Sequence, residues 1–192
     1  MLQDIGPALK NSDKEGLDDI VRRDDEIDIL ETEILKYLGK IRAGKLTEEE
    51  SIEFQGLMIA TDNLESLADI IETDIVALVR KVADVQSRSG DETRRLLKEL
   101  HTSVVKSVEL AVQAVRDNDQ RAAESVLVMK DALRDLSDQL LERKAMRLTA
   151  DDPDYLNLVR LEMSFIDQMR RIYTLAKRIS KVVLPPALAQ RN

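Results

Sequence analysis

Isoleucine returns at every seventh position of one long segment, and leucines lie beside it. The residues of this stripe are Leu17, Ile20, Ile27, Leu30, Ile34, Leu38 and Ile41. Seven residues are close to two turns of an α-helix, so side chains at this spacing share one face. The pattern therefore predicts a helix from Leu17 to Ile41 whose apolar stripe is buried.

Similar helical stripes fill the rest of the chain between short breaks. Gly39 and Gly44 close the first segment, and Ser89–Gly90, Asp151–Asp152–Pro153 and Pro185–Pro186 mark later breaks. Thr47 followed by three glutamates is typical of an N-cap and first turn. The predicted further helices cover residues 48–83, 93–116, 120–148 and 153–179. Because no run alternates as a strand would, the predicted fold class is all-α.

Composition removes several classes of function. The chain of 192 residues has no Cys, one His, three Tyr, two Phe and a net charge of −8, so disulfides, thiolate metal sites and nucleic-acid partners are not expected. His101 alone does not supply a catalytic triad or a His-pair metal motif, and no glycine-rich phosphate loop is present. No apolar run is long enough to span a membrane, and the N-terminus does not resemble a signal peptide. We expect no enzyme, and a reducing cytosolic setting.

The two halves of the sequence repeat each other. At an offset of 106 residues, Asp13 aligns with Asp119, and Ile27 with Leu133. Near the end, Leu64 aligns with Met169 at an offset of 105. The alignment predicts two tandem three-helix bundles, residues 1–89 and 90–192, joined near Ser89–Gly90.

The first helix of the first bundle is incomplete in this alignment. Its counterpart begins near Thr93, whereas only Leu2 to Leu9 of the first helix is present. A bundle that lacks most of one helix exposes an apolar groove, which proteins in water avoid. We therefore expect either that the chain is cut from a longer protein or that a second copy, as a homodimer, covers the groove.

Two segments resemble a known family. They are residues 22–38, RRDDEIDILETEILKYL, and residues 57–71, LMIATDNLESLADII. Both are similar to the PhoU-like domain family, and most of all to the PhoU-like domain at the C-terminal end of bacterial Na⁺/phosphate cotransporters. Residues 100–119 and 169–184 resemble its more basic second repeat. The resemblance implies paired three-helix bundles, a role in control of phosphate uptake, and metal binding through (E/D)-x-x-x-D motifs.

Two acidic pairs are the candidate site. Asp24 and Asp28 share one helical face, as do Glu65 and Asp69. Like charges four residues apart repel, and a hard cation with oxygen ligands would relieve this. The alternative is a solvated face or pairing with Arg and Lys. The PhoU resemblance implies a metal role for all four residues, with iron, zinc or magnesium as the ion.

The second repeat replaces this acidic motif by basic residues. Asp24 aligns with Lys130, Asp28 with Arg134, Glu65 with Arg170 and Asp69 with Thr174. Residues 1–90 accordingly carry a net −10 and residues 91–192 a net +2. One interpretation is structural salt bridges with Asp131, Asp135 and Asp167. The other is an anion site, with phosphate as the candidate anion, built from Lys130, Arg134, Arg170 and Arg171.

The predicted function is a non-catalytic regulatory domain of phosphate transport. From the resemblance, the domain lies on the cytoplasmic side of the inner membrane, attached to the transport unit of a Na⁺/phosphate cotransporter, while the fragment itself is soluble. It acts by binding metal, ligand or partner. The alternatives are a free-standing PhoU-type regulator that meets an ABC transporter or sensor kinase, and a helical interaction scaffold without a small ligand. The basic last helix, with Arg170, Arg171, Lys177, Arg178 and Lys181, is either a solvated face or a contact for anionic lipid headgroups.

Overall fold

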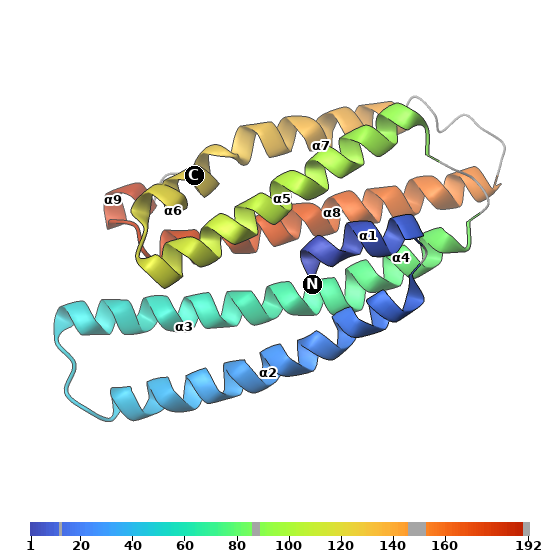
Figure 1. Cartoon of the computed structure of the whole chain (residues 1–192). Coiled ribbons are helices and arrows are strands. Elements are labelled where there is room, and N and C mark those ends of the chain that lie inside the picture. The colour runs from blue at the N-terminus through green and yellow to red at the C-terminus, as the bar shows by residue number, and fades with distance from the viewer. Residues whose placement is uncertain (12, 86–88, 146–152, 190–192) are drawn as a thin grey trace.

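The computed structural model describes residues 1–11, 13–85, 89–145 and 153–189, and these are almost wholly helical. Within these ranges no strand occurs, and the all-α prediction is confirmed. The first half contains α1 (Leu2–Asn11), α2 (Lys14–Arg42), α3 (Glu48–Asp69), the π-helix η1 (Ile70–Ile75) and α4 (Val76–Ala83). The last three form one continuous rod that runs antiparallel to α2 (Figure 1).

The second half repeats this order. It contains α5 (Asp91–Asp117), α6 (Gln120–Val128), α7 (Lys130–Ala145), α8 (Pro153–Lys181) and the short α9 (Pro186–Ala189). The single helix predicted for residues 120–148 is wrong in one respect, because it is divided at Met129 into α6 and α7. Residues 146–148 of that prediction lie outside the described residues. The π-helical turn in the first half was also not expected from the sequence.

The turn that defines the repeat has the same hydrogen bonds in both halves. The backbone N–H of Asp13 donates to the carbonyl of Ala8, and that of Asp119 donates to the carbonyl of Ala114, at 3.0 and 2.9 Å. Each Asp side chain then accepts from backbone N–H groups in the first turn of the next helix. Thr47 forms the predicted cap of α3, as a reciprocal capping box with Glu50.

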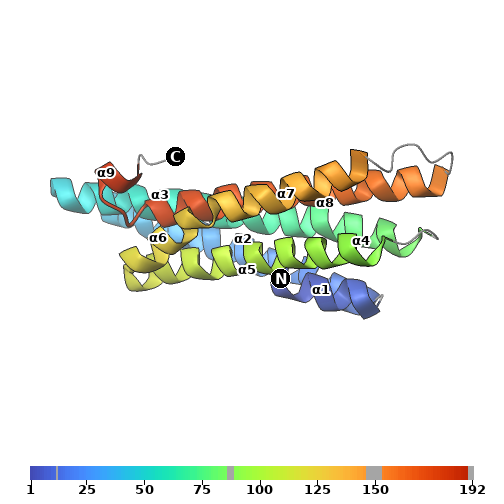
Figure 2. The ribbon, with the colours of Figure 1, turned by 90° about the horizontal axis from the view of Figure 1, so that it is seen from above.

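The core is shared by the two halves. One apolar cluster contains Ile5, Ile20 and Ile75 of the first half together with Leu100, Ile166 and other residues of the second. Helix α8 lies between α5 and the α3 rod, and Figure 2 shows the same neighbours from above. At Gly56 a Cβ atom would lie 3.4 Å from the Cβ of Val182, so α3 is in van der Waals range of the end of α8 at this point.

Helix α1 is held against α5 by a histidine. A ring nitrogen of His101 lies 2.9 Å from the carbonyl oxygen of Leu2, and the ring stacks on Phe165 with centroids 6.4 Å apart. Burial lowers the pKa of His101, so the neutral ring donates to the carbonyl. The lone histidine therefore has a structural contact, in agreement with the absence of catalytic partners noted from the sequence.

The buried stripe predicted on α2 is only partly buried. Leu17, Ile20 and Leu38 are in the core, as predicted. Leu30, Ile34 and Ile41 are exposed, which corrects that prediction, and Ile27 is half-buried. Ile20 and Ile34 lie on the same face of α2, but Figure 1 shows α1 and α4 beside the first part of α2 and only α3 beside its last turns. The same stripe is therefore covered at one end of the helix and uncovered at the other. Among the described helices, none combines the length and the apolar character required to cross a membrane.

Candidate functional site

The two acidic pairs predicted from the sequence face each other between α2 and the α3 rod. Asp24, Asp28 and Glu31 come from α2, Glu65 and Asp69 from α3, and Glu72 from η1. The charges of Asp28, Asp69 and Glu72 act on Asp24, and those of Asp69, Glu31 and Asp28 act on Glu65. We call these six residues the acidic face.

Asp24 is the most perturbed member of the acidic face. Its Oδ1 atom is buried and has no hydrogen-bond partner in the structure. Burial, and then the charges of Asp28, Asp69, Glu72 and Asp25, raise the pKa of Asp24 to about 6. A buried acceptor without a donor is costly, so this position favours either a proton or a cation.

Glu65 shows the same trend on the opposite helix. Partial burial raises the pKa of Glu65, and the charges of Asp69, Glu31 and Asp28 add to the effect. The hydroxyl of Ser66 donates to Glu65 at 3.4 Å, which opposes the increase only weakly. Carboxylates on both helices are therefore held near like charges.

The carboxylates are close enough to repel but are not assembled around one point. Within the described ranges, no three or more Asp, Glu, His or Cys side chains are placed to hold a metal ion together. The chemistry of the donor set nevertheless fits a hard cation, since every donor is a carboxylate oxygen and one of them lacks a partner. Metal binding by Asp24, Asp28, Glu65 and Asp69 stays a prediction.

The four basic residues predicted for an anion site are distributed over different surroundings. Arg134 is paired with Asp131 at 3.1 Å and lies 3.7 Å from Asp135, as the salt-bridge alternative expects. Lys130 is near Lys177, and burial together with the charges of Lys181, Lys130 and Arg178 lowers the pKa of Lys177. Lys130 and Lys177 thus repel each other as Asp24 and Glu72 do in the first half.

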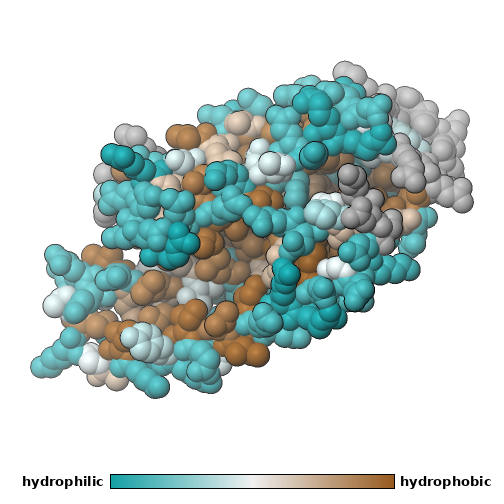
Figure 3. Space-filling model, in the orientation of Figure 1, coloured by the Kyte–Doolittle hydropathy of each residue, from teal (hydrophilic) through white to brown (hydrophobic). Residues whose placement is uncertain are grey.

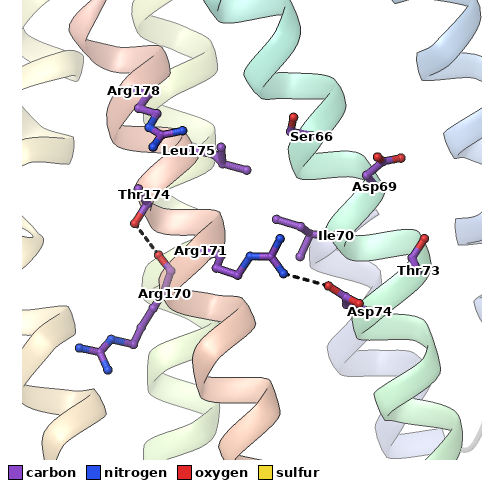
Figure 4. A pocket seen from close by; sticks show the side chains of 10 residues that line it. All are labelled: Ser66, Asp69, Ile70, Thr73, Asp74, Arg170, Arg171, Thr174, Leu175 and Arg178. Carbon is purple, nitrogen blue, oxygen red and sulfur yellow. Dashed lines mark hydrogen bonds and ion pairs between the residues drawn. The ribbon is translucent and has the colours of Figure 1, made fainter.

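Arg170 and Arg171 line a pocket of about 610 Å³ between α8 and the α3 rod. Its other polar residues are Ser66, Asp69, Thr73, Asp74, Thr174 and Arg178. Figure 4 shows Arg171 reaching across from α8 to Asp74 of η1, at 3.2 Å, while the side chain of Arg170 points away from that contact. The pocket therefore joins one edge of the acidic face, at Asp69, to a row of arginines.

The sequence analysis did not select Glu72, and it named Arg178 as part of the basic last helix but not of an anion site. Glu65, Asp69 and Glu72 follow the spacing i, i+4, i+7, so a signal for Glu72 was present. Arg178 follows Arg171 at the same interval of seven, which places both on the pocket side of α8.

Comparison with known proteins finds a family similarity in the first half. The family model of the PhoU domain matches residues 1–79. Residues 1–79 are therefore similar to the PhoU domain, and the resemblance stated from the sequence is confirmed for this part of the chain. The acidic face lies wholly within it.

A longer relative extends the similarity into the second half. The chain is 22% identical over 160 residues to a protein of Salmonella typhimurium strain LT2 that bears the name "Putative inorganic phosphate export protein YjbB". The matched region covers 83% of this chain but only 30% of that relative, so the chain spans less than a third of the relative's length. No solved structure matches the chain.

Proposed function

We propose that the chain is a non-catalytic regulatory domain of phosphate transport, which senses a ligand and biases an attached transport unit. The similarity of residues 1–79 to the PhoU domain supports the regulatory role. The relative named for inorganic phosphate export supports the link to phosphate movement. Because the chain matches only 30% of that relative, we propose further that it works as one domain of a longer transport protein, on the cytoplasmic side, as in Na⁺/phosphate cotransporters.

The proposed ligand of the acidic face is a hard cation bound between α2 and α3. The observation that carries this proposal is the buried, unpartnered Oδ1 of Asp24 among the carboxylates of Asp28, Asp69 and Glu72. A cation would supply the missing partner and cancel the repulsion between the two helices. Asp24, Asp28, Glu65 and Asp69 are its proposed ligands.

The acidic face is connected to the pocket through one stretch of the α3 rod. Asp69 belongs to both, and Asp74, five residues later, pairs with Arg171 of α8 at 3.2 Å. The intervening residues are the π-helix η1, a geometry that often occurs at functional sites. A cation that draws Asp69 toward α2 would change how Asp74 meets α8. This is the proposed path from the ligand to the second half.

Isothermal titration calorimetry with Mg²⁺, Zn²⁺ and Fe²⁺ tests the cation proposal. Asp24→Asn and Asp69→Asn should abolish or weaken binding at least tenfold, because each removes a carboxylate from the acidic face. Glu53→Gln is the matched control, since Glu53 is an exposed acid of α3 outside the acidic face. Absence of heat with all three ions, together with metal-free protein on elemental analysis, would refute the proposal.

A second candidate ligand is inorganic phosphate in the pocket of Figure 4. Arg171, Arg178 and the hydroxyls of Ser66, Thr73 and Thr174 favour an oxyanion there, while Asp69 and Asp74 oppose it unless a cation is bound. Phosphate titration of the parent and of Arg178→Ala tests this, with Arg134→Ala as the control outside the pocket. We expect phosphate to bind more tightly when Mg²⁺ is present. If phosphate produces no heat with the parent protein, either with or without Mg²⁺, phosphate is not the ligand of this pocket.

A further inference from the structure

The α2–α3 hairpin carries an apolar surface that none of the other described helices covers. Along α2, Leu30, Ile34, Tyr37 and Ile41 have exposed fractions of 59, 42, 64 and 37%. The neighbouring α3 exposes Ile52, Leu57, Met58 and Ile59. Figure 3 shows apolar residues gathered over this hairpin, at the lower left of the view. Such an accumulation on one element is typical of an interaction site.

The exposed residues of α2 follow the spacing of a helix–helix interface. Ile27, Leu30, Ile34, Tyr37 and Ile41 are separated by three and four residues in alternation. This is the a and d pattern through which one helix packs on another helix. It continues the face of Ile20, which is buried in the core at the beginning of α2. The later part of α2 therefore exposes the apolar face that its first part buries.

The charges along α2 indicate which partner binds its exposed apolar stripe. Residues 24–33 contain six acidic residues and no basic one, whereas residues 34–45 contain four basic residues and no acidic one. A helix with this division is complementary to a copy of itself placed antiparallel. The acidic segment of each copy then lies beside the basic segment of the other, as a two-fold symmetric contact requires.

We propose that two copies of this chain pair antiparallel through the α2 stripe, about a two-fold axis between Leu30 and Ile34. In this register Leu30 packs on Ile34 of the partner subunit, and Ile27 packs on Tyr37 of the partner subunit. Glu26 and Lys40, which flank the stripe, face each other twice across the contact. Glu33 of the two copies approach near the axis, and Lys36, 2.8 Å from Glu33 in each copy, offsets that repulsion.

A membrane surface fits this stripe less well than a second copy does. Anionic lipid attracts clusters of Lys and Arg, but the six acids of residues 24–33 lie along the same helix and would be repelled. An isologous pair uses both charge segments at once. The stripe also lies on the helix that carries Asp24 and Asp28, so pairing would bring the acidic faces of two copies onto one assembly.

Sedimentation equilibrium of the 192-residue chain tests the pairing. We expect a dimer at micromolar concentration, with Leu30→Asp and Ile34→Asp weakening association at least tenfold. Both side chains are exposed, so these variants should fold, which circular dichroism verifies. Val128→Asp is the matched control, because Val128 is 77% exposed on α6 in the other half. A parent that stays monomeric at several hundred micromolar, or a dimer that Leu30→Asp leaves intact, overturns the proposal.

Charge reversal tests the direction of the contact. Glu26→Lys and Lys40→Glu should each weaken the dimer, because each places like charges opposite one another, and the double variant should restore it. The chain has no Cys, so Leu30→Cys and Ile34→Cys can also be mixed for oxidative crosslinking. Antiparallel pairing crosslinks the two variants with each other, whereas parallel pairing crosslinks each with itself. Binding to anionic vesicles that competes with dimerisation would instead identify the stripe as a membrane contact.

Discussion

The charge at one half-buried position is opposite in the two halves of the chain. Asp24 in α2 aligns with Lys130, and both lie close to a like charge on the third helix of their own half, Glu72 and Lys177. Burial raises the pKa of Asp24 in the first half and lowers the pKa of Lys177, the neighbour of Lys130, in the second. Only the acidic version suits a cation.

Asp24 should destabilise the metal-free protein near neutral pH. Its folded-state pKa is about 6, above the ordinary 3.8, so folding binds a proton and stability rises as pH falls from about 6 to about 4. After allowance for solvent screening, Asp24→Asn should gain about 1 kcal/mol at pH 7 with a chelator present. Urea unfolding of both proteins at pH 7 and pH 4 measures the difference.

Two outcomes are decisive for Asp24. The gain in Asp24→Asn should disappear near pH 4, where the parent is protonated as well. Addition of the bound cation should reverse the order at pH 7, because the parent then gains stability that the variant lacks. A constant difference at both pH values would show that the carboxyl charge is not the cause.

The ion pair of Lys144 and Glu162 offers a contrasting case. The two side chains are almost fully buried, with Nζ 3.5 Å from a carboxylate oxygen, and Ser89 donates to Glu162. Burial lowers the pKa of Lys144 to about 8. Glu162→Gln should cost about 3 kcal/mol, because it leaves a buried ammonium without its counter-ion.

Replacing both residues measures how much the ion pair contributes to stability, whereas replacing one residue measures the cost of leaving a buried charge unpaired. Lys144→Met with Glu162→Met should be neutral or stabilising by up to about 2 kcal/mol, since neither charge then needs to be desolvated. Urea midpoints of the single and double variants provide the comparison. A double variant as unstable as Glu162→Gln would mean that the pair contributes net stability.

At the scale of elements, the turn that the two halves repeat depends, between α5 and α6, on two neighbouring residues. Asn118 has φ 49° and ends α5 in the left-handed region, and Asp119 caps α6 through the N–H groups of Arg121 and Ala122. Asp119→Ala should cost about 1 kcal/mol through loss of the cap. Asn118→Ala should cost about 1 kcal/mol through backbone strain, whereas Asn118→Gly should not destabilise. Thermal unfolding of the three variants checks this order.

Local signals predicted most of the elements but not their partners. Thr47 was predicted as a cap and is one. Asp13 and Asp119 cap helices in the same local way, with bonds within three residues, but the sequence analysis named them only as aligned positions of the repeat. No Pro or Gly lies at the break at Met129 or in the π-turn at Ile70–Ile75, so neither could be predicted from such a residue. The exposure of Leu30 and Ile34 depends on which helices cover α2, and periodicity alone carries no such information.

For the candidate site, too, local spacing in the sequence predicted the residues but not all of their neighbours. The spacing of Asp24 with Asp28, and of Glu65 with Asp69, indicated two acidic faces, and the structure brings them opposite each other. The anion site was predicted by aligning repeats, yet Arg134 is paired with Asp131 and lies outside the pocket of Arg171. An equivalent position in a repeat does not keep equivalent neighbours.

At the scale of the whole molecule, the repeat does not imply two independent units. The apolar cluster crosses the boundary at Ser89–Gly90, and α8 packs on α3 of the first half as well as on α5 of its own. Ile166, Met169 and Ile172 of α8 are fully buried in that shared cluster. Neither half can bury these contacts without the other.

The chain should consequently unfold in a single transition. Calorimetry should give one peak with an enthalpy of about 130 kcal/mol for a chain of this length, equal to the van't Hoff value. Ile172→Ala, in the second half, should cost about 2–5 kcal/mol and lower the midpoint of the whole chain, because it opens a cavity in the shared core. Hydrogen exchange should then increase equally in α3 and in α5. Two peaks, with only the second displaced by Ile172→Ala, would instead mean that residues 1–89 and 90–192 fold separately and that a cation on the acidic face cannot act on α8 through packing alone.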